Sequence, residues 1–367
     1  MLWFRYLPLL ILALLSFAIM ACSSDDSEVV QQPEPAQEPE APVSSSYTPE
    51  IPKQPEVPAA PPAAIVPDQP KPTAQPIVEQ KEREVPEPAT KSSIVIVDAL
   101  GREVAFESAP EKIATISPTA TEMLYVAGGE SVLRDRASRY PAQAQKLPDV
   151  GSAYDPSLEL LIDVSPDLVI IEALTQAQFV PALEKSGFKV ISVKAESVED
   201  VKSNISNIGK ILGSDTIAQA FIDDMENRLA SVGEDDGRSI LILISDRDRN
   251  LYAARPESYT GLIASLMGLV NKAEGMPDFG PFPGFAAMSP ELILAANPDI
   301  IVTITPAPEP APRLSDTIKM IPPFAGLKAM RSGAIIEGDL TLFLQSPGPR
   351  IVEAVEFLKV SLDSIGR

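Results

Sequence analysis

The residue types available for chemistry exclude most enzyme mechanisms. The 367-residue chain contains no histidine and a single cysteine, Cys22, so neither a Ser-His-Asp nor a Cys-His arrangement can form and most transition-metal sites lose their usual ligand. The sequence also lacks the Gly-rich loop of Walker-type nucleotide sites. A pair of carboxylates could hydrolyse a glycoside, but 51 acidic side chains offer many such pairs by chance. We therefore expect no catalysed reaction.

Aromatic side chains and one arginine follow expected strands or lie in loops, where they could form the walls of a ligand site. Tyr154 lies in a loop before an expected helix, and further candidates follow in the second half of the chain: Tyr252, Arg255, Phe279, Phe282 and Phe285. Aromatic walls with a few hydrogen bonds, and an arginine for a carboxylate or phosphate, suit a bulky small molecule. Each aromatic ring could equally pack in the core, and Arg255 could equally be a solvated surface charge.

Short apolar runs alternate with helical patterns along the chain. The runs are rich in β-branched residues and predict buried strands over Ile94–Val97, Leu168–Ile171, Val190–Val193, Ile240–Ile244 and Ile300–Thr303. Helical patterns lie between them, over Thr119–Ala127, Phe179–Ser186 and Tyr259–Leu266. This alternation predicts an α/β fold with mostly parallel sheets.

An internal repeat predicts two similar lobes. The segment Ser157–Ile171 aligns without gaps onto Ser289–Thr303, and each copy has a Ser N-cap, a short amphipathic helix, a Pro-Asp turn and a strand. Between the copies, apolar spacing over Ser214–Ser231 predicts one long helix that joins the lobes. The repeat also places Glu159 and Glu291 at matching positions near the starts of their helices, where each carboxylate interacts favourably with the helix dipole.

The N-terminal residues have the features of a secretory signal. One early charge at Arg5 precedes an apolar stretch that ends in Ile19-Met20-Ala21-Cys22, which resembles the bacterial lipobox. In such a motif the cysteine is diacylated and becomes the new N-terminus. The alternative is a plain signal peptide in which Cys22 is incidental.

Composition changes sharply after Cys22. Residues 23–92 hold 16 of the 38 prolines and few large apolar side chains, so we expect a disordered Pro/Glu-rich tether. The predicted divisions are a signal segment and acylation site at 1–22, the tether at 23–92, an N-terminal lobe at 93–213, a linking helix at 214–232 and a C-terminal lobe at 233–367. The net charge of −21 makes nucleic acid an improbable partner.

Several short motifs occur in an order and spacing that carry a family resemblance. They are Asp98-x-x-Gly101-Arg102, Pro110-Glu111-Lys112-Ile113, Ser117-Pro118-x-x-x-Glu122-Met123-Leu124, Tyr140-Pro141, Leu147-Pro148-Asp149-Val150-Gly151, the stretch from Glu291 to Val302, and Pro347-Gly348-Pro349-Arg350. With these motifs the sequence resembles the periplasmic binding protein family for ferric siderophores, cobalamin and haem. One departure is Gly268-Leu269-Val270-Asn271, where the family usually has Gly-Gly-x-Asn, and it concerns the local turn on the ligand side.

The resemblance implies a fold and a ligand class. It implies two α/β lobes joined by a rigid helix, with a ligand cleft between them and Tyr140 as a cleft residue. The expected ligand is a metal chelate, either a ferric siderophore or a corrinoid, with haem held through a tyrosine as the alternative. Relatives that bind bare zinc or manganese use histidine ligands, so we expect no naked metal site and no cofactor in this chain.

The resemblance also implies a partner and a location. The family delivers its ligand to the permease dimer of an ABC transporter, and Glu159 and Glu291 match the acidic positions that dock with permease arginines, one per lobe. We therefore expect a substrate-binding lipoprotein anchored to the membrane through Cys22 and facing outside the cytoplasm. The rival interpretation is an envelope-anchored adhesin or interaction module that keeps the fold but has no transport role.

Overall fold

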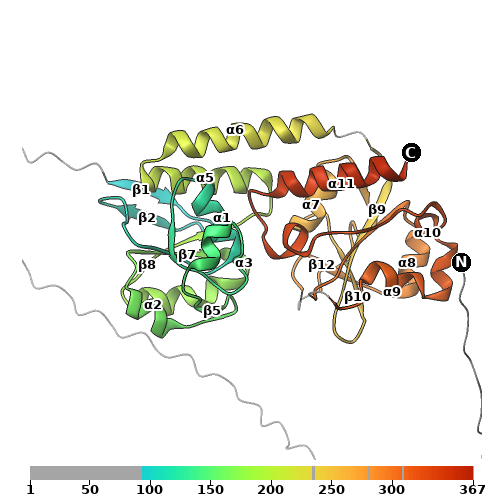
Figure 1. Cartoon of the computed structure of the whole chain (residues 1–367), viewed down its shortest axis with the longest axis horizontal. Coiled ribbons are helices and arrows are strands. Elements are labelled where there is room, and N and C mark those ends of the chain that lie inside the picture. The colour runs from blue at the N-terminus through green and yellow to red at the C-terminus, as the bar shows by residue number, and fades with distance from the viewer. Residues whose placement is uncertain (1–92, 234–235, 280–281, 308–309, 367) are drawn as a thin grey trace, which may run out of the picture. The chain divides into compact units, whose positions relative to one another are not determined.

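The computed structural model describes residues 93–233, 236–279, 282–307 and 310–366, all within one compact unit, Arg83–Arg367 (Figure 1). The expected signal segment, the acylation site Cys22 and the tether lie outside the described residues. Among the helices that the structure describes, none combines the length and the apolar character needed to cross a membrane. Below, N-lobe denotes residues 93–213 and C-lobe denotes residues 233–366.

The N-lobe is built on a four-stranded parallel sheet with the order β4-β3-β7-β8. Its strands are β3 (Ile113–Thr115), β4 (Ser131–Leu133), β7 (Leu168–Glu172) and β8 (Lys189–Val193), and its helices are α1 (Pro118–Val126), α2 (Leu158–Val164), α3 (Ala173–Gln176), α4 (Val180–Lys185) and α5 (Val198–Leu212). Successive strand residues point to opposite faces. Leu168 and Ile170 therefore pack with residues of α1 and α5, whereas Val169 and Ile171 pack with residues of α2 and α4.

The first predicted strand forms, but the prediction of its burial was wrong. β1 (Ile94–Val97) pairs only with β2 (Glu103–Phe106) in an antiparallel hairpin, and Val95 and Val97 are exposed. The turn between the strands is closed by Asp98, whose carboxylate accepts hydrogen bonds from the Arg102 backbone and guanidinium. Burial raises the pKa of this carboxyl, but the hydrogen bonds from Arg102 outweigh that effect and hold it below its usual value.

The C-lobe contains a mixed sheet with the order β12-β10-β9-β13-β14, and β11 pairs with β9. The strands are β9 (Ser239–Ser245), β10 (Leu251–Ala254), β11 (Val270–Asn271), β12 (Phe285–Met288), β13 (Ile300–Ile304) and β14 (Ile335–Glu337). The helices are α7 (Tyr259–Ser265), α8 (Pro290–Ala296), α9 (Leu314–Lys319), α10 (Lys328–Ser332) and α11 (Ile351–Ile365). Strands β9, β11, β13 and β14 pair in parallel, whereas β10 is antiparallel to both β9 and β12.

The repeat is confirmed as a structural unit. Ser157 and Ser289 cap α2 and α8 through their side chains, and both helices end at a residue in the left-handed conformation, Ser165 or Asn297. The following strands, β7 and β13, are buried at every position. The predicted bounds of α1, α4, α6 (Asp215–Val232) and α7 each differ from the observed bounds by at most one residue.

A single helix, α6 (Asp215–Val232), contacts α5 of the N-lobe and α11 of the C-lobe (Figure 1). Its contact with α5 depends on Gly209, because a Cβ there would lie 2.6 Å from the Cβ of Ala218. Its contact with α11 includes a bidentate ion pair in which Arg228 donates to Glu356 at 3.0 and 2.7 Å. The helix is therefore fixed by close packing at one part and by paired charges at another.

Candidate functional site

The carboxyl ends of the N-lobe strands lie at one edge of their parallel sheet and carry the first group of candidate residues. Gln176, just after β7, donates hydrogen bonds of 2.7 Å to the carbonyl oxygens of Ile116 and Ala153. These bonds tie the small hairpin of β5 (Gly151–Ser152) and β6 (Asp155–Pro156) to the sheet edge. Tyr154 in this hairpin is 73% exposed, so its ring is open to a ligand.

Tyr140 lies in the loop that follows β4, and polar contacts hold this loop. The Arg134 guanidinium donates to the carbonyl oxygens of Asp135 at 2.8 Å and Gln145 at 3.5 Å. The Asp135 carboxylate is buried and accepts a hydrogen bond from the Ser138 hydroxyl. Burial raises the pKa of Asp135, although that hydrogen bond opposes the shift. The loop thus presents Tyr140, which is 43% exposed, from a supported backbone.

Tyr140 touches the other lobe through Arg350. Arg350 is the N-cap residue of α11, and the centre of its guanidinium lies 4.3 Å from the Tyr140 ring centroid. The same guanidinium donates to the Glu122 carboxylate of α1 at 2.9 and 2.6 Å. The sequence motif that contains Glu122 and the motif that contains Arg350 therefore meet where the two lobes touch, beside Tyr140.

The Glu122 carboxylate is 1% exposed, so the ion pair is withdrawn from water. Burial raises the pKa of Glu122, and the hydrogen bonds and charge of Arg350 offset this effect only in part. Beside the pair, burial also raises the pKa of the Tyr259 phenol, whose hydroxyl donates to the Leu342 carbonyl oxygen at 3.1 Å. Removing one charge of such a pair leaves the other buried and uncompensated, which is strongly destabilising.

The C-lobe candidates form an aromatic cluster. The Tyr252 ring centroid lies 5.0 Å from that of Phe279 and 4.8 Å from that of Phe282, and the Tyr252 hydroxyl donates to Asp246 at 2.7 Å. Tyr252 and Phe285 are each 5% exposed and belong to the main apolar core. Tyr252 thus packs against the partly buried Phe279 and Phe282, and the Tyr252 and Phe285 rings leave little surface for a ligand.

Arg255 lies at the end of β10, next to the segment that carries Phe279. Its guanidinium forms ion pairs with Glu257 at 3.3 Å and Asp278 at 3.8 Å. The backbone at Arg255 is closely packed, because a Cβ at Gly261 would lie 1.9 Å from the Arg255 carbonyl oxygen. Arg255 thus links the start of α7 to Asp278, the residue before Phe279.

The departure at Gly268-Leu269-Val270-Asn271 leaves the turn well ordered. Gly268 has a φ of 67°, in the left-handed region that favours glycine. The Asn271 amide donates to the Ala254 carbonyl oxygen and its oxygen accepts from the Ala273 backbone, both at 2.9 Å. Leu269, at the departing position, is buried in the core. Asn271 therefore links this turn to the end of β10.

Glu159 and Glu291 occupy the same place in the two repeat copies. Each is exposed in the first turn of its helix, two residues after a capping serine. A hydrogen bond from Ser289 lowers the pKa of Glu291. The residue after each glutamate, Leu160 or Leu292, is also exposed.

Sequence reasoning did not assign a role to Glu122 or Arg350, although both lie in motifs that carried the family resemblance. One signal was available: Glu122 is the only charged residue within α1, and a charge on a buried helix requires a partner. The identity of that partner depends on tertiary structure, because 228 residues separate Glu122 from Arg350.

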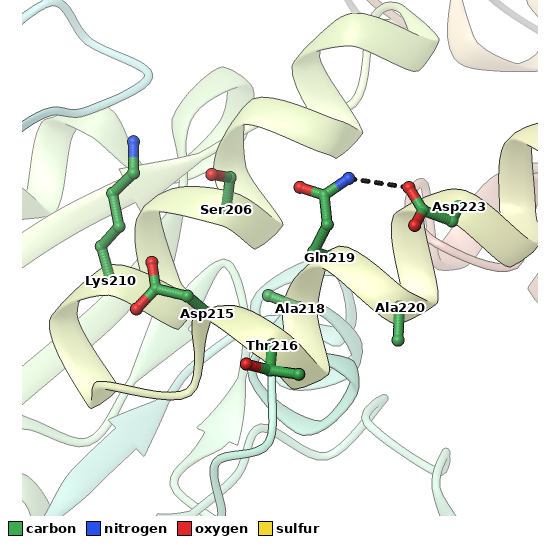
Figure 2. Close-up of a pocket in the computed structure, with 8 residues that line it drawn as sticks. All are labelled: Ser206, Lys210, Asp215, Thr216, Ala218, Gln219, Ala220 and Asp223. Atoms are coloured by element: carbon green, nitrogen blue, oxygen red, sulfur yellow. Dashed lines mark hydrogen bonds between the residues drawn. The ribbon is translucent and has the colours of Figure 1, made fainter.

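A separate surface groove lies between α5 and α6 (Figure 2). Within the described part of the chain, the side chains that line it are small or polar: Ser206, Lys210, Asp215, Thr216, Ala218, Gln219, Ala220 and Asp223. Its lining differs from the aromatic candidates, which come from strands and loops. Across the described ranges, no group of three or more His, Cys, Asp or Glu side chains is arranged to hold a metal ion.

Comparisons with known proteins identify the fold and the family. The chain is 25% identical over 297 residues to the uncharacterized ABC transporter substrate-binding lipoprotein YvrC of Bacillus subtilis (strain 168), covering 77% of this chain and 90% of YvrC. It is 23% identical over 263 residues to a cobalamin-binding protein of Halobacterium salinarum (strain ATCC 29341 / DSM 671 / R1), covering 70% of each. Among solved structures, the petrobactin-binding protein YclQ of Bacillus subtilis matches with a TM-score of 0.66 at 20% identity, covering 76% of this chain and all of YclQ.

The structural match shows that the two-lobed fold is shared, and the sequence expectation of an α/β fold with two similar lobes is confirmed. The model of the periplasmic binding protein family matches residues 113–340, which include both copies of the repeat, Tyr140 and the C-lobe aromatic cluster. The chain belongs to the periplasmic binding protein family.

Proposed function

We propose that this protein captures a bulky metal chelate outside the cytoplasm and delivers it to the permease dimer of an ABC importer. The observation that carries the proposal is the position of Tyr140, an exposed aromatic ring at the contact between the lobes of a periplasmic binding protein. An aromatic ring at such a place offers a flat apolar surface, and the surrounding lobes can enclose a large ligand.

The proposed ligand is a ferric siderophore or a corrinoid. The relatives support this class, because one is named as a cobalamin-binding protein and the solved structure binds petrobactin. In such a chelate the metal arrives with its own ligands, so a chain without histidine can hold it by stacking and hydrogen bonds. Haem is the second candidate, and the exposed hydroxyl-bearing rings Tyr140 and Tyr154 favour it because a tyrosinate can ligate haem iron.

The proposed anchor is a lipid on Cys22. The apolar segment before Cys22 and the lone cysteine at its end support this, as does the name of YvrC as a lipoprotein. The Pro-rich residues 23–92 would then tether the lobes to the membrane beside the permease. Replacement of Cys22 by serine should move the protein from the membrane fraction to the soluble fraction without changing its Tm. A variant that remains in the detergent phase would contradict the anchor.

Ligand titration tests the proposed function. The mature chain from residue 22, carrying Cys22→Ser, should be titrated with cyanocobalamin, haemin and ferric petrobactin. The single tryptophan, Trp3, precedes Cys22, so the intrinsic fluorescence of this mature chain comes from its six tyrosines, which include Tyr140 and Tyr154. We expect saturable quenching by one class of chelate. An adhesin that has lost its ligand would show no saturable response to any of the three, and that result would overturn the proposal.

A further inference from the structure

We propose that Arg350 is a positioning residue that sets which face of the Tyr140 ring meets the ligand, with Glu122 holding the guanidinium in place. This inference rests on the proposed function, because it concerns the same binding site. It adds two residues whose role neither the local sequence pattern nor the comparisons assign. The observation behind it is that three elements meet at one guanidinium: α1, the Tyr140 loop and the start of α11.

The Glu122 carboxylate fixes the orientation of the Arg350 guanidinium. Nε of Arg350 donates to one oxygen of Glu122 at 2.9 Å and Nη2 donates to the other at 2.6 Å. Two parallel hydrogen bonds hold the plane of the group, which a single contact would leave free to turn. Nη1 lies 3.8 Å from Glu353 and adds a weaker attraction. The guanidinium is therefore a rigid planar group at the lobe contact.

That planar group occupies one side of the Tyr140 ring. The guanidinium centre lies 4.3 Å from the ring centroid, within the range of a cation–π contact. The ring nevertheless remains 43% exposed, so the ligand must use the surface that Arg350 leaves open. Arg350 thereby acts on the ligand through Tyr140, by holding the ring in one orientation before the ligand arrives.

The contact also joins the two lobes. Tyr140 and Glu122 belong to the N-lobe, whereas Arg350 begins the last helix of the C-lobe. A movement of one lobe relative to the other would therefore carry the Arg350 guanidinium away from the Tyr140 ring or from the Glu122 carboxylate. The Tyr140 orientation that suits the ligand is thus available only while this contact between the lobes is intact.

The chain offers a control in a second bidentate ion pair, whose side chains are 37% and 39% exposed, against 12% and 1% for Arg350 and Glu122. Arg228 and Glu356 form a bidentate pair with nearly the same distances, 3.0 and 2.7 Å, and it also joins two helices. Arg228 lies on α6 and carries no ring contact among the aromatic and cation–π contacts of the described residues. A lysine at either position keeps the charge and loses the planar fork.

The experiment compares Arg350→Lys and Glu122→Gln with Arg228→Lys in the mature chain that carries Cys22→Ser. Affinity is measured with cyanocobalamin, haemin and ferric petrobactin. In parallel, tetranitromethane nitrates exposed tyrosines, and mass spectrometry compares nitration of Tyr140 with that of Tyr154, which serves as an internal reference. We expect both variants at the lobe contact to weaken binding by roughly two- to thirtyfold. We also expect them to raise nitration at Tyr140 alone, whereas Arg228→Lys changes neither.

The two measurements separate this inference from the proposed function. Unchanged Tyr140 nitration in both Arg350→Lys and Glu122→Gln would overturn the positioning role, whatever the ligand. Wild-type affinity in a variant with raised nitration would overturn it too, because the ring orientation would then not matter for binding. If wild-type protein binds none of the three chelates, the proposed function fails, while nitration still decides whether Arg350 holds the ring. Should Glu122→Gln not fold because it leaves the Arg350 charge uncompensated, Arg350→Lys provides the same comparison with the charge retained.

Discussion

The two lobes share a repeat but present their aromatic residues differently. In the N-lobe, Tyr140 and Tyr154 are exposed at the sheet edge and at the lobe contact. In the C-lobe, Tyr252 and Phe285 lie in the core, and Tyr252 packs against Phe279 and Phe282. The N-lobe therefore offers ring surfaces that are ready for a ligand, whereas the C-lobe rings contact one another.

The two lobes differ in their aromatic residues because these residues lie in segments outside the repeat. Both copies supply a capped helix, a left-handed turn and a buried strand. The N-lobe carries its aromatics on the loop after β4 and on the β5–β6 hairpin, whereas the C-lobe carries them on antiparallel strands and the segment between α7 and β12. The repeated unit thus gives each lobe the same framework and the same exposed glutamate, and the segments outside the repeat give each lobe its own arrangement of aromatic residues.

The prediction with the largest expected effect tests the exposed glutamate that each lobe carries at the same position of the repeat. Replacing both Glu159 and Glu291 by arginine should abolish chelate uptake in cells, because the two proposed attractions to the permease become two repulsions. Affinity for the chelate in solution and Tm should stay near wild type, since both side chains are exposed on α2 and α8. Each single variant should give intermediate uptake.

A second charge reversal provides the control for this double variant. Glu199→Arg combined with Asp316→Arg changes the net charge by the same amount at other exposed positions, and it should leave uptake intact. If Glu159 and Glu291 only interact with their helix dipoles, the first double variant will lose a little stability and still support transport. Normal uptake in that variant would defeat the docking hypothesis.

The next prediction concerns the packed C-lobe aromatics. Tyr252→Ala should lower the free energy of unfolding by about 3–5 kcal/mol, because it opens a cavity beside two phenylalanine rings. Tyr252→Phe removes only the hydrogen bond to Asp246 and should cost about 1 kcal/mol. Tyr154→Ala in the N-lobe should change stability by less than about 0.5 kcal/mol, since its ring is exposed. Denaturant unfolding measures the three variants. If Tyr154→Ala lost as much free energy of unfolding as Tyr252→Ala, the proposed difference between exposed N-lobe rings and packed C-lobe rings would be wrong.

Local sequence signals were sufficient for the repeat and for much of the sheet. Serine caps, the Pro-Asp turn and β-branched runs act over a few residues, so they predicted α2, α8, β7 and β13 closely. Burial was less predictable. The run Ile94–Val97 has the composition of a core strand, but it pairs with β2 alone and leaves Val95 and Val97 exposed. Composition does not reveal how many neighbours a strand will have.

The candidate site was predictable only in part, because its central contact is non-local. Tyr140 could be named from its motif, but its partner Arg350 is the N-cap residue of α11, a helix that the sequence analysis left unassigned. The burial of Tyr252 and Phe285 depends on the antiparallel pairing of β10 with β12. An aromatic residue in a strand fits either a core or a ligand wall, and only the tertiary packing distinguishes the two.

The third prediction tests whether the exposed N-lobe ring of Tyr140 contacts the ligand. Tyr140→Ala should weaken chelate binding by about 1–3 kcal/mol through lost stacking, while the Tm changes little because the ring is 43% exposed. Tyr140→Phe retains the ring and the contact with Arg350, so it should bind a corrinoid or siderophore nearly as well as wild type. For haem held through the phenol, Tyr140→Phe should instead lose affinity. Normal affinity with a large fall in Tm in Tyr140→Ala would show that Tyr140 is a core residue.

The smallest expected effect again compares equivalent positions of the repeat. Asp167 and Asp299 each precede a repeat strand and link it to the neighbouring strand. The Asp167 carboxylate accepts a hydrogen bond from the Lys112 backbone at 2.8 Å. The Asp299 carboxylate accepts from the Ser239 backbone at 3.0 Å and from the Ser239 hydroxyl at 2.5 Å. Lys328 lies 3.2 Å from Asp299. The hydrogen bonds from Ser239, followed by Lys328, lower the pKa of Asp299 from 3.8 to about 2.

A lowered pKa means that the ionised form of Asp299 stabilises the folded state at any pH above 3.8, and that this contribution is lost as the pH falls from 3.8 through about 2. Asp299→Asn should therefore reduce stability at pH 7 by about 1 kcal/mol, less than the full shift implies, because the side chain is 35% exposed and water screens its contacts. The difference from wild type should shrink between pH 4 and pH 2. Urea unfolding of both proteins at several pH values measures this difference, and a difference that persists unchanged at pH 2 would mean that Asp299 acts through packing, with its charge making no contribution.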